Sequence, residues 1–391
     1  MGRSTRKDAP APQCRRVCVV GPGTRFLSGV TYYTFSLIRA LQEDGHRCSA
    51  VLIRRLLPVW LYPGGSRVGA TLTDLRLPDD VERVDGVDWY WGPSLIRAIQ
   101  LVCRERPEIL ILQWWTGVVL HTYLILAVVA RLLGAKVVIE FHEAQDVGEA
   151  RFPVALHYVN SCGRFLMGLS AAQLVHSKFD DDLIRTRYRL NGSLELLPHA
   201  DYDYLPARKP VRPAKPGVIN LLYFGVIRPF KGLEDLVAAF DLVCSAHPHF
   251  WLTVIGETWE DWNLPAELIA ASPYRERITF VNRYVTDEEA AGHFAGADIV
   301  VLPYHRSSSS GPLSIAMGRG LPVVVTRVGG LIEAAARYAG AVSVEPHDPS
   351  ALARGIECGA DLVGQHFEGS ISWSNAAHEY SRLINRWCGH S

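Results

Sequence analysis

Hydrophobic residues along most of the chain alternate between two patterns. Short runs that are apolar at nearly every position, such as "EILILQWW" (108–115) and "AKVVIEFHE" (135–143), are typical of parallel strands covered on both faces. Between such runs, apolar residues recur three and four positions apart, which is typical of helices packed on a sheet. The alternation predicts an open α/β sheet, or two of them.

The runs that predict strands fall into two sets. The first set comprises residues 15–23, 47–55, 108–115, 135–143, 171–177 and 194–199. The second set comprises residues 218–225, 250–257, 277–284, 297–304, 321–330 and 341–346. Helical patterns follow the runs in both sets, so the sequence predicts two copies of one architecture.

A break separates the two sets at residues 207–217, "ARKPVRPAKPG", where prolines and cations replace apolar periodicity. This composition is typical of a linker. We therefore predict an N-terminal domain over residues 15–206 and a C-terminal domain over residues 218–371. Residues 372–391 have the pattern of a final helix.

Charge and cysteine usage narrow the classes of function. The 391 residues carry a formal net charge of zero, so neither a long-range field nor a basic tail favours binding to nucleic acid. The eight cysteines form no C-x-x-C pair, and no histidine cluster has metal-ligand spacing along the chain. We expect free thiols in a reducing compartment rather than disulfides.

Two segments bear on localisation. Residues 115–133 are nearly apolar and approach the length of a membrane-spanning helix, but they lie between two predicted strands and contain His121. A helix buried against a sheet is the favoured interpretation. Residues 1–14 are polar and basic, and no apolar stretch of signal-peptide length follows them. We expect a disordered lead-in and a cytoplasmic protein.

The junctions between strands and helices are the places to look for a ligand, because open α/β sheets bind ligands beyond the carboxyl ends of their strands. In "YFGVIRPFKGLEDLV" (223–237), a strand ends at Gly225 and a helix begins after Gly232. Arg228 and Lys231 precede this helix, whose N-terminus already carries partial positive charge. Two cations there favour a bound anion, and two solvated loop cations are the alternative.

A second junction carries a serine run that ends in Ser310, Gly311 and Pro312. Serine is a good N-cap, and a proline in the first turn of a helix costs no hydrogen bond. We predict a short helix that ends at Arg319, with a second anion cradle at its N-terminus. A flexible serine-rich loop is the alternative.

A third junction, "GPGTRFLSG" (21–29), departs from the dinucleotide-binding fingerprint. Phe26 stands where that fingerprint requires its third glycine. A Rossmann oxidoreductase is therefore the weaker hypothesis.

Several stretches together resemble the family 4 glycosyltransferases. In the second half they are "FGVIRPFKGLEDLVAAF", "LTVIGE", "ITFVNRYVTDEEAAGHFAGADIVVLPY" and "GRGLPVVVTRVGGLIE". In the first half, looser matches are "SGVTYYTFSLIRALQEDGH", "VVIEFHE", "LVHS" and "LLPHADYD". The resemblance covers nearly the whole chain. It implies the GT-B fold, in which two Rossmann-like, doubly wound α/β domains face a cleft, and a last helix (372–391) that crosses back to the first domain.

The resemblance also implies a reaction and its residues. The reaction is a retaining, metal-independent transfer of a sugar from a nucleoside-diphosphate sugar, with no further cofactor. Arg228 and Lys231 would clamp the diphosphate, and His142 would act near the transferred sugar, while Tyr32 and Glu143 would contact the acceptor. The implied donor-binding residues are Gly29, Gly225, Gly232, Gly256, Asn282, Arg283, Tyr284, Ser307, Ser310, Gly311, Pro312 and Leu313. His199 would lie at the hinge.

One departure from the family pattern keeps alternatives open. Ser307 and Ile315 stand where the family usually has two glutamates, and an isoleucine cannot hydrogen-bond a ribose. The phosphate site does not depend on these positions. A catalytically silent sugar-nucleotide-binding partner subunit and a GT-B sugar-nucleotide epimerase are the other interpretations.

The acceptor is not determined by the sequence and remains a sugar, a lipid-linked molecule or a small molecule. "VDWYWGP" (87–93) and "LQWWTG" (112–117) are rich in aromatic residues, and "LIRRLLPVWLYPGGSR" (52–67) mixes them with arginine. Such segments suit a lipid-linked or aromatic acceptor and a peripheral contact with the inner face of a membrane. Packing inside the fold is the alternative.

Overall fold

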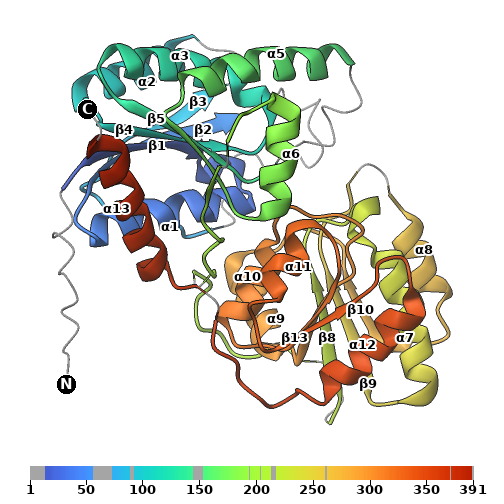
Figure 1. The fold of residues 1–391 in the computed structure, drawn as a ribbon. Helices are drawn as coiled ribbons and strands as arrows, with labels where there is room; N and C mark the ends of the chain where they lie inside the picture. Colours follow the sequence, from blue (N-terminus) through green and yellow to red (C-terminus); the bar gives the residue numbers. More distant parts are fainter. Residues whose placement is uncertain are drawn as a thin grey trace, which may run out of the picture.

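The computed structural model of the chain describes residues 14–55, 73–88, 92–143, 153–192, 194–202, 204–212, 217–259, 262–369 and 371–389. Over these residues, strands and helices alternate in two halves, which Figure 1 shows as an upper and a lower α/β unit. The predicted fold class is therefore confirmed.

The first unit is built on a seven-stranded sheet in the order β3-β2-β1-β4-β5-β6-β7. All its pairings are parallel. Its strands are β1 (Arg16–Pro22), β2 (Arg47–Arg55), β3 (Glu82–Asp88), β4 (Ile109–Trp114), β5 (Lys136–Phe141), β6 (Ala172–Val175) and β7 (Glu195–Leu196). Its helices are α1 (Gly29–Glu43), α2 (Pro93–Glu105), α3 (Leu120–Leu132), α5 (Pro153–Leu169) and α6 (Lys178–Tyr188).

The second unit is built on a six-stranded parallel sheet in the order β10-β9-β8-β11-β12-β13. Its strands are β8 (Ile219–Phe224), β9 (Phe250–Ile255), β10 (Ile278–Val281), β11 (Ile299–Leu302), β12 (Val323–Thr326) and β13 (Ala341–Val344). Its helices are α7 (Leu233–Ala246), α8 (Leu264–Ala271), α9 (Asp287–Gly296), α10 (Gly311–Gly318), α11 (Gly329–Ala335) and α12 (Pro349–Ala360).

Each apolar run from which we predicted a strand contains a strand in the structure. One further strand, β3, was not predicted. Its sequence "ERVDGVD" alternates charges with valines, and its first residues, Glu82 and Arg83, are exposed. β3 is an edge strand paired only with β2 in the described sheet, so burial on both faces is not required of it. An edge strand of this composition lacks the apolar signal on which the prediction depends.

The apolar segment 115–133 is confirmed as a helix packed on the first sheet. A 3-10 turn (Gly117–Val119) leads into α3, whose residues Tyr123, Leu126 and Ala130 are fully buried. Among the described residues, no helix combines the length and the apolar character needed to span a bilayer.

The predicted linker is attached to the second unit along part of its length. The backbone N–H of Val211 donates to the carbonyl of Gly292 in α9 over 2.9 Å. The guanidinium of Arg212 makes two hydrogen bonds to the carboxylate of Asp298, of 2.8 and 3.1 Å. Residues 207–212 therefore do not behave as a free tether.

The last helix, α13 (Trp373–Gly389), lies beside α1 in the first unit (Figure 1). Two hydroxyl groups of α13 hold it there. Tyr380 donates to the buried carboxylate of Glu140, and Ser381 donates to the carboxylate of Asp44. The chain thus returns to its first unit after completing the second.

The contact between the linker and α9 predicts the effect of a methyl group at Gly296. A Cβ built there would lie 2.0 Å from the carbonyl oxygen of Val211, and this backbone atom cannot rotate away. Gly296→Ala should therefore lower the free energy of unfolding by about 1 to 3 kcal/mol, which urea denaturation would measure.

The matched control is Gly168→Ala near the end of α5, where an added Cβ meets no heavy atom within 4 Å. Alanine is the better helix former, so this variant should be neutral or slightly more stable. Equal stability of the two variants would contradict the docked linker.

Candidate functional site

Three cations gather around one aromatic ring at the carboxyl edge of the second sheet. Phe230 lies in a 3-10 turn (Pro229–Lys231) between β8 and α7. The ring centroid of Phe230 is 5.1 Å from the guanidinium carbon of Arg228, 5.6 Å from Nζ of Lys231 and 5.0 Å from the guanidinium carbon of Arg306. Arg306, which follows β11, is therefore a third cation beside the two that the sequence predicts. We call Arg228, Lys231 and Arg306 the cation cluster.

Two members of the cation cluster carry positive charge that no carboxylate of the described residues neutralises. Lys231 and Arg306 have no hydrogen bond or ion pair to a carboxylate among the described residues. Nζ of Lys231 instead lies 3.6 Å from the ring centroid of Tyr304, a cation–π contact. Like charges this close repel each other, so the arrangement suits a bound anion.

Two glycines allow close backbone packing beside the cation cluster. Gly232 has φ of 61°, a left-handed conformation, and a Cβ there would lie 2.0 Å from the carbonyl oxygen of Pro303. Only glycine fits this turn. Gly256 has a similar role, because its Cβ would lie 1.8 Å from the carbonyl oxygen of Gly225.

The N-terminus of α10 reaches the same edge of the sheet. Ser310 is the N-cap, and its hydroxyl accepts from the backbone N–H of Leu313 over 3.3 Å. Pro312 lies in the first turn and comes within 3.6 Å of a Cβ built on Gly225 at the end of β8. The predicted helix and its cap are confirmed, and Gly225, Gly256 and Pro312 meet at one place.

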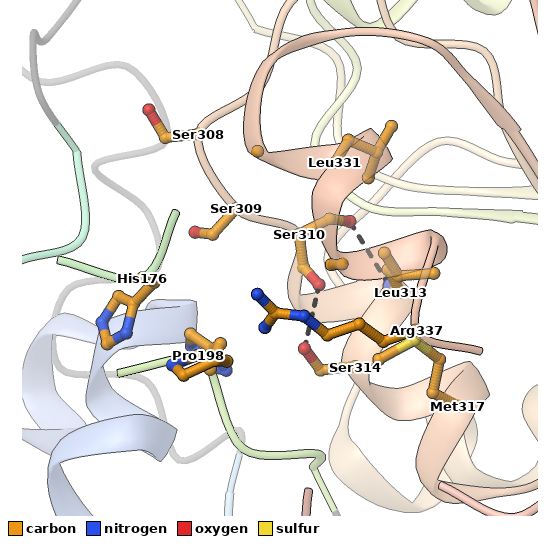
Figure 2. A pocket seen from close by; sticks show the side chains of 13 residues that line it. His176, Pro198, Ser308, Ser309, Ser310, Leu313, Ser314, Met317, Leu331 and Arg337 are labelled. Atoms are coloured by element: carbon orange, nitrogen blue, oxygen red, sulfur yellow. Dashed lines mark hydrogen bonds between the residues drawn. The ribbon is translucent and has the colours of Figure 1, made fainter. Parts of the chain in front are cut away.

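A pocket lies between the two units (Figure 2). His176, Pro198 and His199 of the first unit face Ser308, Ser309 and Ser310 across it, and the other residues that line it belong to α10 and α11, with Arg337 just after α11. Figure 2 shows the side chain of Arg337 extending into this space. Arg228, Lys231 and Arg306 do not line this pocket.

His142, His176 and His199 form a cluster on the first-unit side, in which His142 and His176 are buried and His199 is half-buried. They follow β5, β6 and β7, and the ring centroids of neighbouring members are about 5 Å apart, at 5.0 and 5.1 Å. Burial lowers the pKa of His142 well below its ordinary value, that of His176 to about 4 and that of His199 to about 3. All three imidazoles are therefore neutral at pH 7.

The buried carboxylate of Glu140 lies next to this histidine cluster. Glu140 accepts hydrogen bonds from Tyr33 over 2.7 Å, from Gln113 over 2.6 Å and from Tyr380 of α13. Burial raises the pKa of Glu140 to about 7 in spite of these donors. The side-chain oxygen of Gln113 in turn contacts Nε2 of His142. This chain of bonds orients His142 and couples it to α13.

His142 lies at the strand end where we expected it, but it is nearly enclosed. Its side chain packs against Tyr33, with ring centroids 4.6 Å apart, and it is 4% exposed. The histidines that reach the pocket are His176 and His199. Glu143 is exposed just beyond β5.

Tyr32 and Gly29, which we also expected at the cleft, differ in their exposure to solvent. Tyr32 is buried, and its hydroxyl donates over 2.5 Å to the carboxylate of Asp287 in the second unit. Tyr32 thus bridges the units. Gly29 opens α1, and a Cβ built there would meet no heavy atom within 4 Å. The backbone at Gly29 is therefore approachable.

The remaining residues that we expected to bind the donor form hydrogen bonds to neighbouring side chains or within their own loops. Asn282 accepts from the backbone N–H of Thr258 over 2.9 Å, and the Ser307 hydroxyl donates to the carbonyl of Ser309 over 2.8 Å. Arg283 makes two hydrogen bonds to Glu289, of 2.9 and 2.6 Å. The pKa of the Glu289 carboxyl falls to about 2 because of this guanidinium. Tyr284 is half-buried and Gly311 is the first residue of α10.

Some expectations fall on residues that are not described. Residues 1–13, most of the basic-aromatic segment 52–67, and the aromatic residues 89–91 lie outside the described part of the chain.

Sequence reasoning missed Arg306, Arg337 and His176 as site residues. Arg306 and the serine run lie directly after β11, so the rule about strand ends would have included Arg306. Arg337 follows α11, and nothing local in the sequence distinguishes it from a surface arginine. His176 directly follows β6, within the stretch "LVHS", so the rule about strand ends would have included it as well.

The histidine cluster predicts a pH dependence of stability. In the unfolded chain, His176 and His199 bind protons below about pH 6.5, but in the fold they stay neutral down to about pH 4. The unfolded state therefore binds more protons in this window, and the free energy of unfolding should rise with pH from 4.5 to 6.5. Glu140 opposes this trend, because the folded state retains its proton up to about pH 7.

Replacement of one histidine isolates its contribution. His176→Gln should reduce the slope of unfolding free energy against pH by about 1.4 kcal/mol per pH unit, the value for one proton. His378→Gln, at an exposed position of α13, serves as the control. An unchanged slope in His176→Gln would refute the neutral, buried state of His176.

Comparisons with known proteins agree with this architecture. Residues 219–359 match the family model described as "Glycosyl transferases group 1". The chain is 31% identical over 156 residues to a glycogen synthase of Mycobacterium tuberculosis, covering 38% of this chain and 36% of that protein. It is 38% identical over 124 residues to a D-inositol 3-phosphate glycosyltransferase of Pseudarthrobacter chlorophenolicus, covering 30% and 29%. The chain thus spans about a third of the length of these relatives.

Similarity to solved structures extends over nearly the whole chain. The catalytic domain of starch synthase IV from Arabidopsis thaliana, bound to ADP and acarbose, superposes with a TM-score of 0.68 at 12% identity and covers 97% of this chain and 100% of that domain. At such identity the likeness concerns the fold. The chain therefore has the GT-B fold of two Rossmann-like domains, and its residues 219–359 match the group 1 glycosyl transferases.

Proposed function

We propose that the protein is a retaining glycosyltransferase of family 4 that moves a hexosyl group from a nucleoside-diphosphate sugar to an acceptor. The first domain would bind the acceptor, and the second would bind the donor. The transfer would need no divalent metal ion and no further cofactor. An inner-membrane surface contact would accompany a lipid-linked acceptor, and a free sugar or small molecule would require none.

The observation that carries the proposal is the cation cluster beside two helix N-termini. Breaking the bond between the sugar and the diphosphate leaves negative charge on the departing diphosphate. Fixed cations and backbone N–H groups that are already aimed at this charge lower the barrier, because no reorganisation is required during the reaction. Lys231 and Arg306 have no carboxylate partner among the described residues, so they are available for that role.

The relatives support the same class of chemistry. A glycogen synthase and a D-inositol 3-phosphate glycosyltransferase both match this chain over part of their length, and the starch synthase domain of the same fold was solved with ADP. A nucleoside diphosphate is the form in which the leaving group departs.

The neutral imidazole of His142 suits a position beside the sugar. A neutral, oriented ring can accept a hydrogen bond from a sugar hydroxyl without adding positive charge where an oxocarbenium-like centre develops. Gln113 and Glu140 fix the ring in one orientation. In this role His142 requires a small movement of Tyr33, because the two rings are in contact.

A second candidate function follows from Ser307 and Ile315. Ile315 is 2% exposed in α10 and belongs to the core, so this position offers no polar contact to a ribose. A sugar-nucleotide-binding subunit without turnover would fit the same cation cluster. Binding of nucleoside diphosphates without transfer or hydrolysis of any donor would favour that candidate.

Removal of Lys231 tests the diphosphate clamp. Lys231→Ala should lower the turnover number by about two to three orders of magnitude, the typical cost of losing one preorganised charge stabiliser. Turnover would be measured as nucleoside diphosphate released from UDP-, GDP-, ADP- and dTDP-sugars with an acceptor panel.

The control for this experiment is Arg275→Ala. Arg275 is an exposed cation that precedes β10 and therefore lies at the opposite edge of the same sheet. It should transfer sugar at the wild-type rate. Near-normal turnover in a folded Lys231→Ala protein would exclude the assigned site.

Metal independence of the transfer gives a separate test. If protein cations neutralise the leaving group, turnover without added Mg²⁺ or Mn²⁺, and with EDTA present, should stay within about twofold of turnover with these ions. The assay should run well below the melting temperature, so that stability does not enter the rate. A collapse that millimolar Mg²⁺ or Mn²⁺ restores would reject metal independence.

A further inference from the structure

Two further histidines lie beside a carboxylate at the carboxyl edge of the second sheet. Asp235 lies in the first turn of α7, His305 follows β11, and His347 lies between β13 and α12. One ligand atom of each residue lies within 4.8 Å of the others. These residues are far apart in sequence and arrive from three different backbone segments.

The contacts among the three residues are short and direct. Nε2 of His305 lies 2.8 Å from Oδ2 of Asp235. The rings of His305 and His347 face each other with centroids 3.7 Å apart and an interplanar angle of 32°. In a tetrahedral zinc site with bonds of about 2.0 Å, neighbouring ligand atoms lie about 3.3 Å apart. Nε2 and Oδ2 would therefore move apart by about 0.5 Å when an ion replaces the hydrogen bond between His305 and Asp235.

Lone pairs remain open in this group, unlike those of the buried Glu140. Three donors already occupy the Glu140 carboxylate. In the part of the chain that the structure describes, neither ring nitrogen of His347 has a hydrogen-bond partner, and Asp235 accepts only from His305. His347 is exposed, so an ion could arrive from solvent.

The backbone holds these ligands in place before any ion binds. His347 has φ of 59°, a left-handed conformation that is costly for a residue with a side chain. The N–H of His305 donates to the carbonyl of Phe230 over 2.9 Å, and the N–H of Asp235 donates to the carbonyl of Gly232 over 3.1 Å. Such preorganisation reduces the ordering cost of binding.

An acidic side chain also lies near the three residues. Glu234 precedes Asp235 in the first turn of α7 and is half-buried. Its Oε2 atom is buried and has no hydrogen-bond partner among the described residues. A cation beside Asp235 would offset the cost of burying this carboxylate.

We propose that Asp235, His305 and His347 bind a divalent transition-metal ion, with Zn²⁺ as the best match. Two imidazoles and one carboxylate suit Zn²⁺, Co²⁺ or Ni²⁺, whereas Mg²⁺ and Ca²⁺ prefer oxygen ligands alone. A fourth position would be left to water or to Glu234. This site is distinct from the cation cluster and does not depend on the proposed function.

The ion would fasten three loops at the donor edge of the second domain. It would tie the start of α7, which follows Lys231, to the segment that leads into the serine loop and to the segment that opens α12. Its effect would therefore be on stability and loop order, and the sugar transfer itself would still proceed without it.

Melting temperature against Zn²⁺ concentration tests the site. With Zn²⁺ in hundredfold excess over its dissociation constant, wild type should melt on the order of 5 °C higher than in EDTA. His347→Asn and Asp235→Asn should lose most of this shift, and asparagine tolerates the left-handed backbone at position 347. His157→Asn removes an exposed histidine on α5 and should retain the full shift.

Cobalt distinguishes the proposed ligands from cysteine thiolates. Cys14, Cys103 and Cys358 are exposed and free, so zinc alone could bind there. Stoichiometric Co²⁺ bound by imidazole and carboxylate gives visible bands without a thiolate charge-transfer band in the near ultraviolet. Loss of the visible bands in His347→Asn, with retention in His157→Asn, supports the proposal. Equal melting shifts in all variants, or a thiolate band alone, would overturn it.

Discussion

Every strand pairing among the described residues is parallel, and this constraint decides where the chemistry can lie. In a parallel sheet, all strands end at one edge and every returning helix starts there. His142, His176 and His199 follow three neighbouring strands, so they form a cluster although long segments of chain separate them. In the second sheet, β8 and β11 are neighbours, and Arg228 and Arg306 therefore reach the same ring.

The sequence predicts the fold well where burial is complete and poorly where it is not. Strands such as β4 and β5 are buried on both faces, so their residues must be apolar at every position. β3 at the sheet edge escapes this requirement and leaves no apolar signal. Helix ends were predictable at Gly232 and Ser310, because left-handed turns and N-caps depend on one residue type each.

The residues discussed as candidate sites also differ in whether the sequence predicts them. Lys231 and Arg228 were predictable because they lie before a helix in one continuous stretch. The grouping of Asp235, His305 and His347 was not, because it depends on loop conformations such as the left-handed backbone of His347. Spacing along the chain detects a metal site only when its ligands come from one or two elements.

Lys231 and Arg306 have no carboxylate partner among the described residues, although the formal net charge of the chain is zero. Two carboxylates of the second domain are used as contacts with the first. Asp287 accepts from Tyr32 and from Thr73, each over 2.5 Å, and Glu333 accepts from the backbone N–H groups of residues 178 and 179 at the start of α6. That helix end carries partial positive charge, which a carboxylate neutralises.

These contacts join the two domains through carboxylates that do not belong to the cation cluster. Burial raises the pKa of Asp287, so its ionised form depends on the hydroxyl groups that the first domain supplies. Widening the cleft at that contact would remove those donors while leaving the carboxyl in place, and water would have to replace them. The proposed diphosphate site and the contacts between the domains therefore use different charged groups, so binding of a diphosphate there would not require either contact to break.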